Sequence, residues 1–179
     1  MDILQLLFDR SLPRDPVFVF ESAILGGHLH IVKWLHEEKG ITNAVAGYID
    51  AARRDQLDML KYLFEKEVIA TPYLFPISAA AEAGFLEVVQ WLHLHTKTEC
   101  TERAMDAAAG QGHLHIVQWL HENRTEGCTR RAMDRAASNG HLDVVMWLYE
   151  NRTEGCSRKT IEGAAWFEYS DALTWLFEN

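Results

Sequence analysis

The stretch that decides the fold is TERAMDAAAGQGHLHIVQWLHENRTEGC at residues 101–128, followed directly by TRRAMDRAASNGHLDVVMWLYENRTEGC at residues 129–156. Two similar segments of 28 residues in tandem form an internal repeat, and a period of roughly 20 to 50 residues is typical of repeat proteins. A more divergent copy, SRKTIEGAAWFEYSDALTWLFEN, follows at residues 157–179. The period therefore predicts a protein built from stacked copies of one unit.

The same register extends back toward the N-terminus. An alanine and, eleven residues later, an aromatic residue mark every unit, with steps of 28 residues and one step of 29. The alanines are Ala23, Ala51, Ala80, Ala108, Ala136 and Ala164, and the aromatic residues are Trp34, Tyr62, Trp91, Trp119, Trp147 and Trp175. We predict one repeat domain over residues 1–179, with a half repeat at 1–15 and repeats at about 16–41, 42–70, 71–100, 101–128, 129–156 and 157–179.

Each unit contains two helical patterns separated by a turn. In the unit at 101–128, Met105, Ala108, Ala109 and Gly112 lie on one stripe of a helix, and their small size permits close helix contact. The second pattern, around Ile116 to Leu120, is bulkier and supplies most of the core. Gly112 permits the turn between the helices, where a positive φ is useful. The pattern predicts an all-α solenoid of stacked antiparallel helix pairs with short loops, and the aromatic ladder is expected in the core.

The turn and second helix carry a recognisable motif, Gly-His-Leu-x-Val/Ile-Val. It stands as GHLHIV at 27–32, GFLEVV at 84–89, GHLHIV at 112–117 and GHLDVV at 140–145. This motif resembles the ankyrin repeat, although the period is 28 residues instead of the usual 33 or so. It is similar to the short ankyrin-like units that form long arrays in some protists. The resemblance implies short loops without projecting β-hairpin fingers, and a concave face of first helices that grips partners.

The composition limits which classes of partner and which cellular compartment suit this protein. The chain has 17 Lys and Arg against 26 Asp and Glu, a formal charge of −9, which argues against nucleic acid or an anionic membrane as the ligand. Three cysteines do not suit a secreted disulfide framework, the N-terminus lacks a basic segment typical of signal peptides, and no apolar run approaches membrane-spanning length. We therefore expect an intracellular, cytoplasmic monomer.

The cysteines and histidines are explained by packing. Cys100, Cys128 and Cys156 occupy one position in successive repeats, too far apart for a disulfide or a shared zinc ion, and small apolar residues replace them in earlier repeats. His113 and its equivalents are expected to form structural hydrogen bonds, and phenylalanine replaces His93 and His121 in other repeats. The sequence shows no catalytic motif. We predict no metal site, no cofactor and no enzymatic activity.

Binding specificity is expected where the repeats differ, because positions alike in every repeat serve the stack. The pairs Arg103 with Asp106 and Arg131 with Asp134 have the spacing of surface ion pairs. The candidate partner-binding residues on the first helices and the following turns are Arg53, Arg54, Glu82, Glu102, Arg103, Asp106, Gln111, Arg130, Arg131, Asp134, Arg135, Ser138, Asn139 and Arg158. The sequence predicts a non-catalytic scaffold that binds a protein partner through this face. The alternative is a targeting arm of a larger protein whose catalytic part lies outside this chain.

Overall fold

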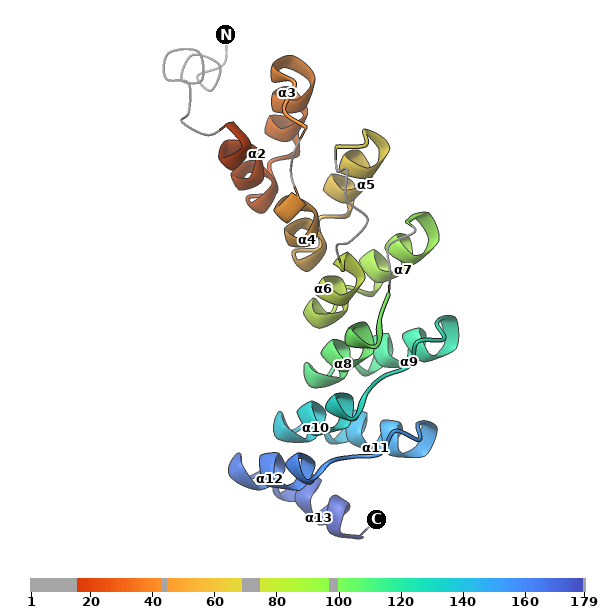
Figure 1. The fold of residues 1–179 in the computed structure, drawn as a ribbon. Coiled ribbons are helices and arrows are strands. Elements are labelled where there is room, and N and C mark those ends of the chain that lie inside the picture. The colour runs from red at the N-terminus through yellow and green to blue at the C-terminus, as the bar shows by residue number, and fades with distance from the viewer. Residues whose placement is uncertain (1–15, 43–44, 69–74, 97–99, 179) are drawn as a thin grey trace. The chain divides into compact units, whose positions relative to one another are not determined.

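A computed structural model describes residues 16–42, 45–68, 75–96 and 100–178 of the chain (Figure 1). These residues form twelve α-helices and no β-strand, which confirms the predicted all-α fold. The half repeat predicted at residues 1–15 lies outside the described residues. The chain divides into two compact units, residues 1–71 and 72–179. The single domain over 1–179 stays a prediction.

The first unit contains two helix pairs. The helices are α2 (Pro16–Leu25), α3 (Leu29–Lys39), α4 (Val45–Arg53) and α5 (Leu57–Glu65). The first helices α2 and α4 pack against each other, and each also packs against its own second helix. Ala23 and Ala51, at the alanine position of the repeat, are both buried. Their small side chains let the two first helices approach closely.

The second unit contains four helix pairs. The helices are α6 (Pro76–Ala83), α7 (Leu86–His95), α8 (Glu102–Gly110), α9 (Leu114–Asn123), α10 (Arg130–Ser138), α11 (Leu142–Asn151), α12 (Arg158–Trp166) and α13 (Ser170–Glu178). The first helices α6, α8, α10 and α12 form one row, in which each packs against the next, and α7, α9 and α11 lie beside them in a second row (Figure 1). This is the predicted solenoid of neighbouring helix contacts.

The row of first helices depends on small side chains. The alanines at 80, 108, 136 and 164 are fully buried, as the repeat register predicts. Gly110 also faces the next repeat, since a Cβ added there would lie 3.1 Å from the Cβ of Arg135. The first helices therefore stack without the bulky side chains that would separate their backbones.

Glycine at the turns around Gly84 and Gly112 has two physical reasons, although Asp55 and Glu168 occupy the equivalent turn position in other pairs. Gly112 has φ +77°, a left-handed conformation in which other residues are strained. A Cβ at Gly112 would lie 2.5 Å from the His141 ring of the following repeat. Gly84 is related in the same way to His113, whose Nε2 lies 3.2 Å from the carbonyl oxygen of Glu82. The Gly-His pair thus joins neighbouring repeats, and the structural role predicted for His113 is confirmed.

The aromatic ladder is less buried than predicted. Tyr62 is only 7% exposed, but Trp91, Trp119, Trp147 and Trp175 are half-buried. Trp119 packs edge-to-face on His93 of the preceding repeat, with ring centroids 5.3 Å apart, and Trp147 packs on His121 at 5.2 Å. The expectation of a core position is therefore wrong for these tryptophans. Trp119, Trp147 and Trp175 each bridge two neighbouring second helices, whereas Trp91 stacks on His95 of its own helix.

Candidate functional site

The candidate binding surface starts at the N-termini of the first helices α8, α10 and α12. Thr101, Thr129 and Ser157 cap α8, α10 and α12, and each hydroxyl oxygen accepts a hydrogen bond from the backbone N–H two residues later. These N···O distances are 3.3 Å, 3.1 Å and 3.2 Å. The caps fix the start of each helix, so the residues that follow occupy equivalent places in successive repeats.

Two aspartates connect the caps Thr129 and Ser157 to the preceding repeat. The Asp106 carboxylate accepts hydrogen bonds from Thr129 N at 2.7 Å and from Thr129 Oγ1 at 2.6 Å. Asp134 accepts equivalent bonds from Ser157 N at 3.0 Å and Ser157 Oγ at 2.7 Å, and a third from the Thr160 hydroxyl. We call these two sets of contacts the aspartate clasps.

The clasps correct the sequence analysis. Asp106 and Asp134 were expected on the exposed binding face, paired with Arg103 and Arg131, but Asp106 is 5% exposed and Asp134 is half-buried. Their carboxylates turn toward the N-terminus of the next first helix, because backbone N–H groups that lack a helical partner are strong donors to a carboxylate. The carboxylates of Asp106 and Asp134 therefore hold neighbouring repeats together and are not available to bind a partner.

Burial raises the pKa of the Asp106 carboxyl above its usual value. The hydrogen bonds from Thr129 and the charge of Arg135 act in the opposite direction without cancelling this effect. A carboxyl whose pKa is raised in the folded state holds its proton more tightly there than in the unfolded chain. Its contribution to the free energy of unfolding is therefore greatest at low pH and is lost as the pH rises through the folded pKa.

Asp106→Asn tests this pH dependence. The neutral amide can accept from Thr129 N and donate to Thr129 Oγ1, so it keeps the contacts without the titration. We expect the free energy of unfolding of the native chain to fall relative to that of the variant as the pH rises from about 3 to about 6. Urea unfolding at a series of pH values measures the difference. A difference that stays constant or moves the other way would contradict the assignment.

Two further predicted binding residues also make contacts within the protein. Asn139 Nδ2 donates to the Gly110 carbonyl oxygen of the preceding repeat at 2.5 Å, and Ser138 Oγ donates to the Asp134 carbonyl oxygen at 2.7 Å. Ser138 is half-buried against Gly163 of the next repeat. The residue types at positions 138 and 139 therefore depend on how neighbouring first helices fit together. Comparing the repeats in the sequence did not show this.

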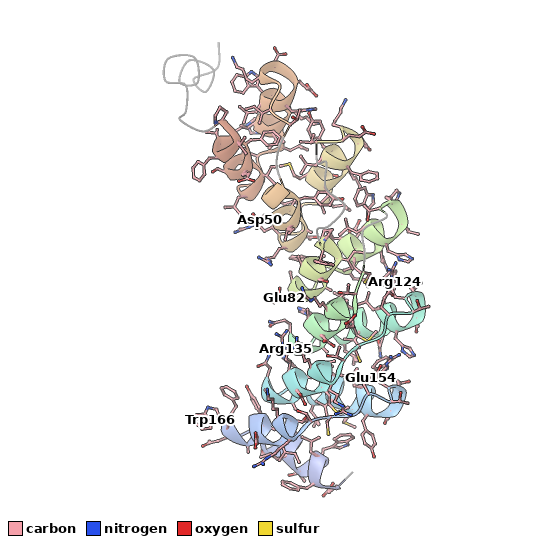
Figure 2. All side chains as sticks on the ribbon, in the orientation of Figure 1. Asp50, Glu82, Arg124, Arg135, Glu154 and Trp166 are labelled. Atoms are coloured by element: carbon pink, nitrogen blue, oxygen red, sulfur yellow. The ribbon has the colours of Figure 1, made fainter. Side chains whose placement is uncertain are left out.

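The remaining candidates are exposed. They are Arg53 and Arg54 in the first unit, and Glu82, Glu102, Arg103, Gln111, Arg130, Arg131, Arg135 and Arg158 in the second. Figure 2 shows Glu82 and Arg135 along one side of the second unit, whereas Arg124 and Glu154 lie on the other side. Arg103 lies over the Phe75 ring at 5.7 Å, Arg130 Nε donates to the Glu154 carbonyl oxygen at 3.1 Å, and Arg158 pairs with Glu162 at 2.6 Å.

The loops after the second helices contain polar contacts that the sequence analysis missed. Arg124 forms an ion pair with Glu126 and reaches His93 Nδ1 of the preceding repeat at 3.0 Å. Arg152 pairs with Glu154 in the same way and reaches His121 Nδ1 at 3.3 Å. The hydrogen bond from Arg152 lowers the pKa of Glu154. The signal was the identical NRTEG sequence in both loops, which marks a position that serves the stack.

The cysteines are free thiols, and two of them are packed as predicted. Cys100 and Cys128 are buried, and burial raises the pKa of each thiol to about 11, so neither is an activated nucleophile. Cys156 is exposed, which corrects the prediction for that residue. Arg124 and Arg152 lie beside Cys100 and Cys128, whereas no such loop covers Cys156 in the described residues.

Among the described residues, no group of three or more His, Cys, Asp or Glu side chains is placed to hold a metal ion. The paired histidines His113 and His115 have ring centroids 6.1 Å apart in an edge contact. No helix in the described part of the chain is long and apolar enough to span a membrane.

The second unit is thus a helical repeat protein in which alanines, Gly-His pairs and polar clasps join the repeats, and in which the first helices keep an exposed polar face. Residues 77–160 match the family model for ankyrin repeats in three copies. Residues 77–160 therefore consist of ankyrin repeats, and the resemblance inferred from the Gly-His-Leu motif is confirmed. A comparison with curated proteins gives no match. Ankyrin repeats are generally protein–protein interaction modules, and ankyrin repeat domains are typically non-catalytic.

Proposed function

We propose that the chain is a non-catalytic scaffold that binds a protein partner through the exposed face of its first helices. The most direct support is that the polar side chains of the second unit fall into two sets. In the second unit, the residues that link repeats are buried or hydrogen-bonded within the protein. Arg135, by contrast, is exposed and differs from its equivalents Ala107 and Gly163. Side chains that vary and do not serve the stack are available to determine specificity.

A pair of charge-reversal variants tests this face. Arg131→Glu with Arg135→Glu changes two exposed residues of α10. Glutamate at 131 is favourable near the helix N-terminus and glutamate at 135 is slightly unfavourable in the last turn, so the two effects on the helix oppose each other. Lys61→Glu with Lys66→Glu is the control, since it makes the same charge change in the first unit. Lys61 is on α5 and Lys66 directly follows that helix.

Quantitative affinity capture from cells, with melting curves of all three proteins, measures the effect. We expect the α10 variant to lose its enriched partners by about tenfold or more while the control retains them, because truncated or reversed charges at an interface centre cost roughly 2 kcal/mol or more. Equal partner sets for both variants would exclude this face.

We further propose that the chain acts as a monomer in the cytoplasm and does not bind nucleic acid. Three free thiols suit a reducing compartment. The formal charge of −9 opposes polyanionic ligands.

A further inference from the structure

We propose that the starts of α8, α10 and α12 form a binding surface for an extended acidic segment of a protein partner. This inference rests on the proposed scaffold function and names the chemistry of the partner. The surface consists of the exposed side chains of Arg103, Arg130, Arg131 and Lys159, which we call the basic edge. Arg103, Arg131 and Lys159 occupy the same position in three successive repeats.

Among the residues that the structure describes, the aspartate clasps leave Arg131 and Lys159 without an ion-pair partner. From the sequence, Asp106 and Asp134 would neutralise the arginines three residues before them. In the structure both carboxylates accept hydrogen bonds from the next repeat, and Asp106 is buried. Within the described residues, the side chains of Arg131 and Lys159 make no ion pair. Asp106 and Asp134 therefore do not form ion pairs with the arginines three residues before them.

These cations also stand where they do not stabilise their own helices. The first turns of α10 and α12 contain no acidic residue and begin with Arg130-Arg131 and Arg158-Lys159. A helix N-terminus carries a partial positive charge, so basic residues there are unfavourable for the helix. The terminal N–H groups are already capped by Thr129 and Ser157, which leaves the side chains as the groups that can bind.

Geometry and charge favour an extended acidic chain. Neighbouring packed helices lie roughly 8 to 10 Å apart, and an extended chain advances about 3.3 Å per residue, so carboxylates about three residues apart match successive repeats. Arginine binds carboxylates in a two-pronged geometry. The net charge of −9 on the whole chain repels a dense polyanion such as nucleic acid more strongly than a peptide with spaced charges.

Fluorescence anisotropy with the intact chain tests the proposal. The probe is a labelled peptide of repeated Glu-Ser-Gly, and its controls are a peptide of the same composition with the glutamates clustered and one with glutamine in place of glutamate. A single-stranded oligonucleotide of similar length is the third probe. At about 50 mM salt, where surface charges are weakly screened, we expect the spaced peptide to bind at least about threefold more tightly than the clustered one. The glutamine peptide should not bind.

Arg131→Glu with Lys159→Glu should weaken binding of the spaced peptide by about tenfold or more, whereas Lys61→Glu with Lys66→Glu should leave it within about twofold. Equal binding to both variants, no binding to the native chain, or tighter binding of the oligonucleotide would each overturn the proposal.

Competition separates this result from the scaffold function. If Arg131→Glu with Arg135→Glu abolishes partner capture but the spaced peptide does not displace that partner, the face remains supported and the acidic chemistry is wrong. If the peptide displaces the captured partner, both proposals are supported.

Discussion

Replacing Asp134 by alanine is expected to lower the free energy of unfolding by about 2 to 4 kcal/mol. The Asp134 carboxylate accepts from Ser157 N, from the Ser157 hydroxyl and from the hydroxyl of Thr160, which is fully buried. Removing it leaves these donors without their partner, and a buried donor left in that state costs roughly 1 to 3 kcal/mol.

The position of Asp134 also predicts where the effect appears. Because each repeat of a solenoid contacts only its neighbours, the loss should loosen α12 and α13 more than α8 and α9. Urea unfolding measures the total change, and amide hydrogen exchange locates it. Asp143→Ala is the matched control, since this aspartate is exposed in the first turn of α11 and its loss should cost less than about 1 kcal/mol. Similar losses for both variants would show that the clasp contributes nothing specific.

Gly112→Ala is expected to destabilise the protein by about 2 to 4 kcal/mol, and Gly155→Ala by only about 1 kcal/mol. The two glycines have nearly the same backbone conformation, with φ +77° and +70°. They differ in what lies beside them. A Cβ at Gly112 would meet the His141 ring at 2.5 Å, whereas a Cβ at Gly155 would meet nothing within 4 Å.

The comparison therefore separates the backbone cost from the contact between repeats. Thermal and urea unfolding of both variants measure the two costs. A double variant, Gly112→Ala with His141→Ala, should recover part of the loss, because removal of the ring makes room for the methyl group. If Gly112→Ala and Gly155→Ala cost the same, the close approach of His141 does not limit the turn.

The ankyrin repeats and the order of helices could be predicted from the sequence alone. The 28-residue period, the buried alanine position and the glycine turns all depend on local geometry, since helix periodicity shows which side of a helix is apolar. The Gly-His-Leu motif identified the ankyrin repeat before any contact was known. These features are repeated in nearly every unit, so equivalent positions can be compared within one chain.

The candidate site could be predicted only in part. Exposed basic residues such as Arg131 and Arg135 were found, because they differ from their equivalents in other repeats or lie beside residues that do. Asp106 and Asp134 were assigned to the same face, and the polar contacts of Arg124 and Arg152 were missed. The spacing along one helix suggested that each aspartate pairs with the arginine three residues before it. Local spacing cannot show that stronger hydrogen-bond donors to these aspartates come from the next repeat.

The sequence by itself determined the repeat, the two helices of each unit and the small residues between first helices. Only the tertiary structure decided the partners of the polar groups. The nearest donor to Asp106 lies 23 residues away in the chain, at Thr129, and becomes its neighbour only when two repeats stack. Apolar burial follows from the periodicity of one helix, whereas a directional hydrogen bond requires two groups at a set distance, and stacking sets that distance.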